Sequence, residues 1–205
     1  RIAQRRQKKD YVKIQDVLLK NVKLIDEAVK NKGSVTGLPT GFKKLDEVTS
    51  GLQPSDLIII AARPAMGKTA FALNIAQQSA VKAGASVLIF SLEMSQEQLG
   101  QRLISMEARV EADKIKKGNL DINDWKNINY ALNELNKTKI VIDDTPGISV
   151  MEMRNKCRRL KAEQGLDLIV VDYLQLMTFG GRAESRQQEI SEISRSLKGL
   201  ARELN

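Results

Sequence analysis

Residues 57–69 read LIIIAARPAMGKT, and this stretch decides the fold of the chain. The first five residues are apolar, which predicts a buried strand over residues 57–61. Residues 62–69 then follow the phosphate-binding pattern G-x-x-x-x-G-K-[ST], with Ala62 in place of the first glycine. A helical pattern begins near Thr69. Strand, loop and helix in this order predict a nucleotide-binding loop rather than an incidental turn.

The predicted loop supplies several groups that suit a polyphosphate. Successive backbone N–H groups and the positive end of the following helix would face the phosphates. Lys68 can reach the β and γ phosphates, and the Thr69 hydroxyl can ligate Mg²⁺. Pro64 stiffens the loop, whereas Arg63 either contacts the nucleotide or holds the loop to its neighbours. The predicted nucleotide-binding residues are Ala62, Arg63, Pro64, Ala65, Met66, Gly67, Lys68, Thr69 and Ala70.

The rest of the chain alternates between predicted helices and strands. Apolar strands separated by helices predict an α/β fold, with a mostly parallel sheet flanked by helices. Ser95 with Gln98, and Ser149 with Glu152, have the spacing of capping boxes. Helices are predicted over residues 69–83, 95–109, 121–136, 149–165 and 184–204, and strands over residues 86–91, 139–143 and 168–172.

Two carboxylates follow predicted strands and could complete a nucleotide site. Asp172 ends the apolar run of residues 168–171, which is typical of a strand-end Mg²⁺ ligand. Tyr173 stands where some nucleotide hydrolases place a catalytic Glu, so that base must come from elsewhere. Glu93, just past the strand over residues 86–91, is the predicted catalytic base. Its alternative role is to favour the N-terminus of the following helix.

A glycine-rich stretch over residues 178–186 is a candidate DNA contact. Its predicted DNA-binding residues are Gly180, Gly181, Arg182 and Arg186, because arginines and backbone amides can lie along a phosphate backbone. An ordinary surface loop is the alternative. For Asp143 and Asp144 a role in a turn is favoured over one in the site.

Composition narrows the class of protein. The chain has 205 residues and a net charge of +8, which suits a polyanionic partner but also fits a solvated basic surface. Its one cysteine, Cys157, cannot form an intrachain disulfide and fits a reducing cytosol. Histidine is absent, and no apolar run reaches the ~20 residues of a membrane span. No signal peptide is visible.

The N-terminal part differs from the rest. Residues 1–11 are basic, and apolar residues recur at steps of three and four over residues 12–30, which predicts an amphipathic helix. Its apolar stripe packs either on its own domain or on another subunit. We therefore expect a basic lead-in and linker helix over residues 1–34 and one nucleotide-binding domain over residues 35–205. The chain starts without Met and ends right after a helical pattern, so we expect a fragment that is incomplete at its C-terminus.

Four motifs together resemble one family. They are ARPAMGKT at residues 62–69, SLEM at residues 91–94, DDTPG at residues 143–147 and DYLQLM at residues 172–177. In this order they resemble the bacterial replicative DNA helicases of the DnaB type, which are hexameric and have a RecA-like motor domain. Ala62 and the Arg-Pro of the loop match that family rather than the general pattern.

The resemblance implies a P-loop, RecA-like ATPase domain that hydrolyses ATP with Mg²⁺ between the subunits of a hexameric ring. Such a ring would move along single-stranded DNA in the cytoplasm and unwind the duplex at a replication fork. Lys68 would bind the phosphates, and Glu93 would be the catalytic base. The Mg²⁺ ligands would be Thr69 and Asp172. The loop at Gly180–Arg186 would line the channel, and the linker helix would dock on the neighbouring subunit.

The resemblance also implies primase and a helicase loader as partners of the full-length protein. Residues 1–205 by themselves are expected to bind ATP, to hydrolyse it poorly and not to unwind DNA. The sequence also fits three other classes of protein: a different RecA-like ATPase such as a recombinase or clock-type ATPase, a small-molecule P-loop kinase, and a non-catalytic ring adaptor.

Overall fold

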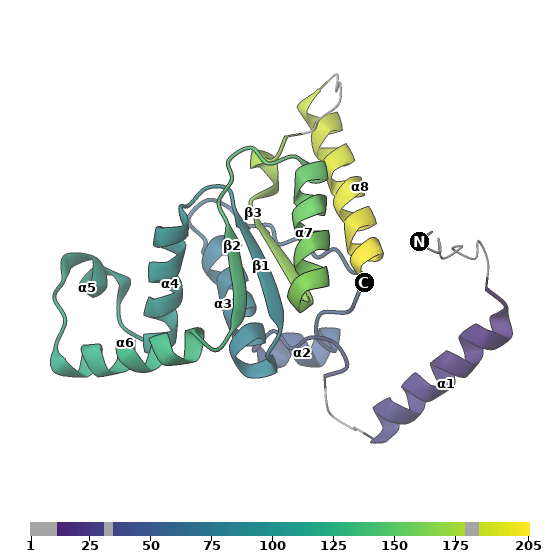
Figure 1. Cartoon of the computed structure of the whole chain (residues 1–205), viewed down its shortest axis with the longest axis horizontal. Coiled ribbons are helices and arrows are strands. Elements are labelled where there is room, and N and C mark those ends of the chain that lie inside the picture. The colour runs from purple at the N-terminus through teal and green to yellow at the C-terminus, as the bar shows by residue number, and fades with distance from the viewer. Residues whose placement is uncertain (1–11, 31–34, 179–184) are drawn as a thin grey trace, which may run out of the picture.

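The computed structural model describes residues 12–30, 35–178 and 185–205, and there it has the predicted α/β architecture (Figure 1). Its three-stranded sheet has the order β2-β1-β3, and both pairings are parallel. The strands are β1 (Ser86–Ser91), β2 (Lys139–Asp143) and β3 (Leu168–Asp172), which confirms these three sequence predictions. All three strands therefore end at the same edge of the sheet.

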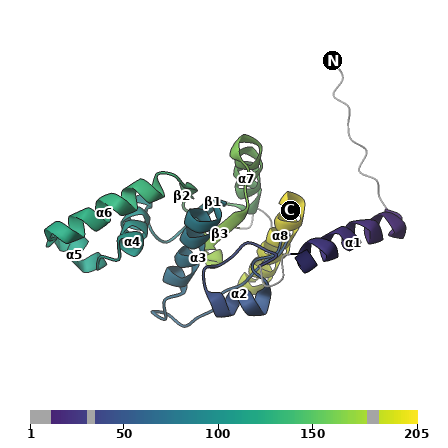
Figure 2. The same ribbon diagram turned by 90° about the horizontal axis from the view of Figure 1, so that it is seen from below.

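Helices cover both faces of the sheet, as Figures 1 and 2 show. On one face, Val87 and Ile89 of β1 pack with apolar side chains of α3 (Lys68–Ala83) and α4 (Gln96–Ala108). On the other face, Leu88 and Phe90 pack with α7 (Val150–Gln164) and α8 (Arg186–Leu204). Strand β1 is buried along its whole length, which explains its unbroken apolar run.

The remaining helices lie around this body. Helix α1 (Ile14–Lys30) confirms the predicted amphipathic helix and lies outside the α/β body in both views (Figures 1 and 2). Helix α6 (Ile122–Leu135) was predicted, whereas α2 (Lys43–Thr49) and α5 (Ala112–Lys117) were not, because seven or six residues are too short to give a clear period. None of the helices described is long and apolar enough to cross a membrane.

Local capping signals set several helix ends as predicted. Ser95 and Gln98 form the reciprocal capping box of α4. Gly84 ends α3 with a φ of 67°, in the left-handed region that glycine tolerates. The Ser149 side chain caps α7 by accepting from the Glu152 N–H, which is one of the two bonds of the predicted capping box.

The prediction of a strand over residues 57–61 is wrong in this structure. The segment has no ladder with any described strand, although Leu57 packs against the core that β1 shares with α7 and α8. Ile58 and Ile59 remain 53% and 70% exposed. An apolar run signals a tendency to be buried, but a strand also needs a neighbouring backbone in register, and none of the described residues pairs with this segment.

Candidate functional site

The phosphate loop is shaped by two residues with positive φ. Ala65 has a φ of 64° and Gly67 a φ of 86°, and the first turn of α3 begins directly afterwards at Lys68. The Met66 N–H donates to the Arg63 carbonyl at 3.3 Å, which closes a tight turn. The left-handed conformation at Ala65 costs free energy that glycine would not lose, as is common where backbone must approach a ligand. The loop therefore leads straight into a helix N-terminus.

Lys68 is joined to the strand-end carboxylate. Its Nζ lies 3.3 Å from Oδ1 of Asp172, at the end of β3. Asp172 is only 5% exposed, so the ammonium compensates a largely buried charge. The same Nζ lies 4.2 Å from the centre of the Tyr173 ring. The structure thus brings the predicted phosphate binder and the predicted Mg²⁺ ligand into contact.

Glu93 lies at the same edge of the sheet. Ser91 is the register partner of Asp172, and the Leu92 N–H donates to the Asp172 carbonyl at 2.8 Å, so the chain leading to Glu93 leaves the sheet beside Asp172. The Ser91 hydroxyl donates to the Met94 carbonyl at 2.7 Å, which fixes the turn between them. The Glu93 side chain is exposed. A carboxylate here can reach solvent water, as a general base must.

The oxygen donors of the site suit Mg²⁺. Thr69 offers a hydroxyl and Asp172 a carboxylate, and hard oxygen ligands are what this ion prefers. In the parts of the chain that the structure describes, no three His, Cys, Asp or Glu side chains gather as a metal cluster. Mg²⁺ commonly binds through one or two protein oxygens together with substrate phosphates and water, so the residues present fit that mode.

The two consecutive acids at the end of β2, Asp143 and Asp144, have structural partners. Asp143 accepts from Lys156 Nζ at 2.6 Å and from the Thr145 N–H at 3.0 Å. Burial raises the pKa of Asp143, but these hydrogen bonds outweigh it and the net shift is downward. Asp144 accepts from the Gln96 N–H at 3.1 Å, at the start of α4. The bond from Thr145 favours the predicted turn role for Asp143, whereas Asp144 joins the turn to the start of α4.

Of the four predicted DNA-binding residues, the structure describes only Arg186. Gly180, Gly181 and Arg182 lie outside the described residues. Arg186, in the first turn of α8, donates to the Gln175 carbonyl and forms an ion pair with Glu189. The contact with Gln175 ties the start of α8 to the short 3-10 helix η1 (Leu174–Leu176).

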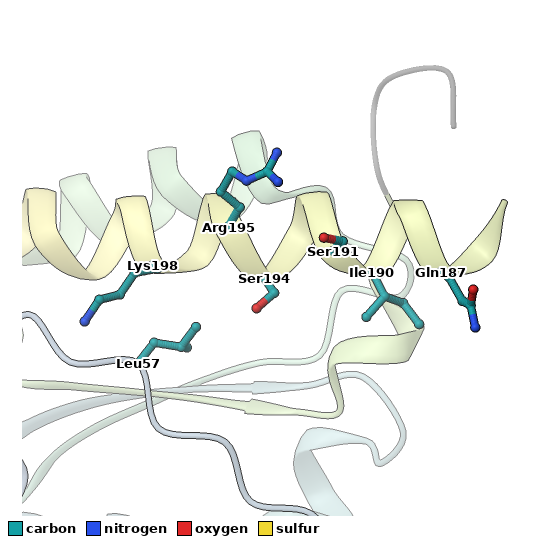
Figure 3. A pocket seen from close by; sticks show the side chains of 7 residues that line it. All are labelled: Leu57, Gln187, Ile190, Ser191, Ser194, Arg195 and Lys198. Carbon is teal, nitrogen blue, oxygen red and sulfur yellow. The ribbon is translucent and has the colours of Figure 1, made fainter. Parts of the chain in front are cut away.

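A hollow lies between Leu57 and α8, and Figure 3 shows Leu57 facing the helix across it. None of residues 62–69 lines it, so it is separate from the phosphate loop. The lining residues are Leu57, Gln187, Ile190, Ser191, Ser194, Arg195 and Lys198.

The contact of Tyr173 with Lys68 was not predicted from the sequence. The available signal was an aromatic residue directly after the strand-end carboxylate, but the sequence could not say that its ring would lie against this lysine.

A phosphate loop before a helix, together with carboxylates at the ends of two neighbouring parallel strands, is the arrangement of a P-loop domain of the RecA-like class. The DnaB-like helicase C terminal domain family matches residues 37–205, and the chain belongs to that family.

The chain is also similar over nearly its full length to known helicases. It is 52% identical over 204 residues to the replicative DNA helicase DnaC of Bacillus subtilis (strain 168), covering 99% of this chain and 45% of that protein. The replicative DNA helicase DnaB of Geobacillus stearothermophilus gives the same identity and coverage. The chain thus spans less than half the length of these relatives.

Two solved structures have the same fold. One is described as an ATPase domain and superposes with a TM-score of 0.88 at 37% identity, covering 95% of this chain and 69% of that one. The other is a DnaB-like replicative helicase, described with its interactions with primase. It gives a TM-score of 0.82 at 37% identity, covering 95% of this chain and 46% of that one.

Proposed function

We propose that this chain is the motor of a replicative DNA helicase, which hydrolyses ATP to move along single-stranded DNA and unwind the duplex at a replication fork. One observation carries the proposal: Lys68, Asp172 and the turn that bears Glu93 meet at one edge of the sheet, beside the phosphate loop. Membership of the helicase family favours this activity over a small-molecule kinase or a non-catalytic adaptor.

Each residue has a distinct proposed role in hydrolysis. Residues 62–70 bind the nucleotide, with backbone N–H groups and the Lys68 ammonium on the phosphates. Glu93 takes a proton from the attacking water while the bond between the γ phosphorus and the departing ADP oxygen breaks. Thr69 and Asp172 would hold Mg²⁺, which neutralises phosphate charge when it is bound.

The proposed partners follow from the family. We propose a hexameric ring with nucleotide between subunits, in which α1 docks on a neighbour, and single-stranded DNA near the segment that includes Gly180, Gly181, Arg182 and Arg186. Primase is a proposed partner because a DnaB-like relative is described as interacting with it. A helicase loader and a cytoplasmic location would accompany the same role. We also propose the division into a lead-in and linker helix at residues 1–34 and an ATPase domain at residues 35–205.

The test separates nucleotide binding from hydrolysis. We expect Lys68→Ala to abolish nucleotide binding, because it removes the ammonium that we place on the β and γ phosphates. We expect Glu93→Gln to keep the dissociation constant within about twofold but to lower turnover by roughly 10²- to 10⁴-fold. Binding is measured on this chain, and ATP turnover on the full-length protein, with and without single-stranded DNA.

Glu97→Gln is the matched control, since Glu97 is also an exposed acid and lies four residues further on, in the first turn of α4. It should change neither binding nor turnover. A turnover indifferent to DNA would point to another class of P-loop protein. Unchanged turnover in Glu93→Gln would show that another residue is the catalytic base.

A further inference from the structure

Tyr173 contacts Lys68, the lysine that we propose binds the phosphates. It follows Asp172 at the end of β3, and its half-buried ring lies under the Lys68 ammonium, 4.2 Å from the ring centre to Nζ. The Asp172 carboxylate lies 3.3 Å from the same nitrogen. Lys68 therefore contacts two consecutive residues, Asp172 at the end of β3 and Tyr173 directly after it. Neither of them belongs to the phosphate loop.

Both contacts favour the same position of the ammonium. The face of an aromatic ring carries negative electrostatic potential and attracts a cation. Asp172 is 5% exposed, so its charge is costly without a nearby cation. The Lys68 side chain is 30% exposed, so neither burial nor packing alone confines it.

We propose that Tyr173 is a positioning residue that holds the Lys68 ammonium beside Asp172 while no nucleotide occupies the loop. An incoming phosphate then competes with the ring and the carboxylate for the same ammonium. Removing the ring frees Lys68 and makes it more available to phosphates and to reagents. The part of this inference that concerns nucleotide rests on the proposed function, whereas the part that concerns Lys68 itself does not.

The first experiment measures how available Lys68 is in the nucleotide-free chain. The protein is labelled with trace sulfo-N-hydroxysuccinimide acetate, and the labelling rate of Lys68 is read by peptide mass spectrometry relative to Lys126, which is exposed on α6. We expect Tyr173→Met to raise the relative rate about twofold to fivefold, the size of a cation–π contact at a partly exposed site. Tyr173→Phe keeps the ring and should match the wild type.

Two outcomes would overturn the proposal. One is an unchanged Lys68 rate in Tyr173→Met and in a second non-aromatic variant, Tyr173→Leu, which replaces the first if it does not fold. The other is an equal rise in Tyr173→Phe, because the hydroxyl rather than the ring would then be responsible. Unchanged far-ultraviolet circular dichroism shows that the variants are folded.

The second experiment measures the competition with phosphate. Fluorescently labelled ADP is titrated into each variant in EDTA, so that the measurement depends on the chain alone. Tyr173→Met should bind about twofold to fivefold more tightly than the wild type, and Tyr173→Phe should bind equally. If neither Tyr173→Met nor Tyr173→Leu binds the labelled ADP more tightly than the wild type, the proposed competition is wrong. If the wild type binds no nucleotide, the proposed function fails, and the labelling experiment still decides the role of Tyr173.

Discussion

At the scale of single residues, burial determines the reactivity of the Cys157 thiol. It lies on α7, and its side chain is fully buried in the core that α7 shares with β1. Burial, followed by the charge of Asp143, raises the thiol pKa from 9.0 to about 12. A thiol reacts as the thiolate, so this side chain is protected twice, by its pKa and by its lack of access. We therefore assign it a structural role.

A pH dependence follows for Cys157. Above pH 9.0 the unfolded chain loses the thiol proton while the folded chain keeps it, so unfolding becomes more favourable as the pH rises toward about 12. We expect this contribution to stability to be complete below pH 9.0 and to disappear between these values. Urea unfolding at about pH 8, 10 and 11 measures it, with Cys157→Ala as the control that lacks the titrating group. An equal loss of stability in both proteins would contradict the assignment.

At the scale of elements, glycines show where backbone shape matters. Gly51 has a φ of +80°, and a Cβ there would lie 2.4 Å from Val35 Cγ1 and 2.9 Å from the Leu38 carbonyl oxygen. Gly100, within α4, has ordinary helical backbone, and a Cβ there would meet no atom within 4 Å. The two positions should respond to alanine in opposite directions.

We expect Gly51→Ala to lower the free energy of unfolding by about 1–3 kcal/mol, because the side chain strains the backbone and meets neighbouring atoms. Gly100→Ala should raise it by about 0.5–1 kcal/mol, since alanine favours a helix over glycine. Urea denaturation of both variants beside the wild type gives the two values. A more stable Gly51→Ala variant would contradict the strain assigned to Gly51, and a less stable Gly100→Ala variant would contradict the helix propensity argument at Gly100.

At the scale of the whole molecule, α1 leaves an apolar face without a partner among the described residues of this chain. Its exposed apolar residues recur on one side of the helix and include Ile14, Leu18, Val22, Ile25 and Val29. An amphipathic helix is stabilised chiefly by burying such a face, so its proposed place is against a second subunit.

We expect the double change Leu18→Gln and Val22→Gln to weaken self-association while leaving thermal unfolding of the α/β body unchanged. Lys23→Gln is the control, because Lys23 is exposed on the opposite side of the same helix. Light scattering coupled to size-exclusion chromatography, over a range of concentrations, reports the association. If the wild type, the double variant and Lys23→Gln associate equally, the apolar face of α1 does not form the interface.

The sequence by itself determined the elements whose signals are local. The strand over residues 86–91 was predicted correctly because both of its faces are buried, and this leaves an unbroken apolar run in the sequence. The α4 start at Ser95 was predicted because its cap lies within three residues. The phosphate loop and Asp172 were identified as a candidate site because a fixed spacing and a strand end carry that information.

Only the tertiary structure decided what depends on partners distant in the chain. Residues 57–61 are as apolar as a buried strand, yet they have no ladder with the described strands because pairing requires a second backbone in register. The contact of Lys68 with Asp172 and Tyr173 joins groups more than a hundred residues apart, and no local pattern encodes that distance. Composition sets which side chains tend to be buried, whereas packing of the folded chain sets which of them meet.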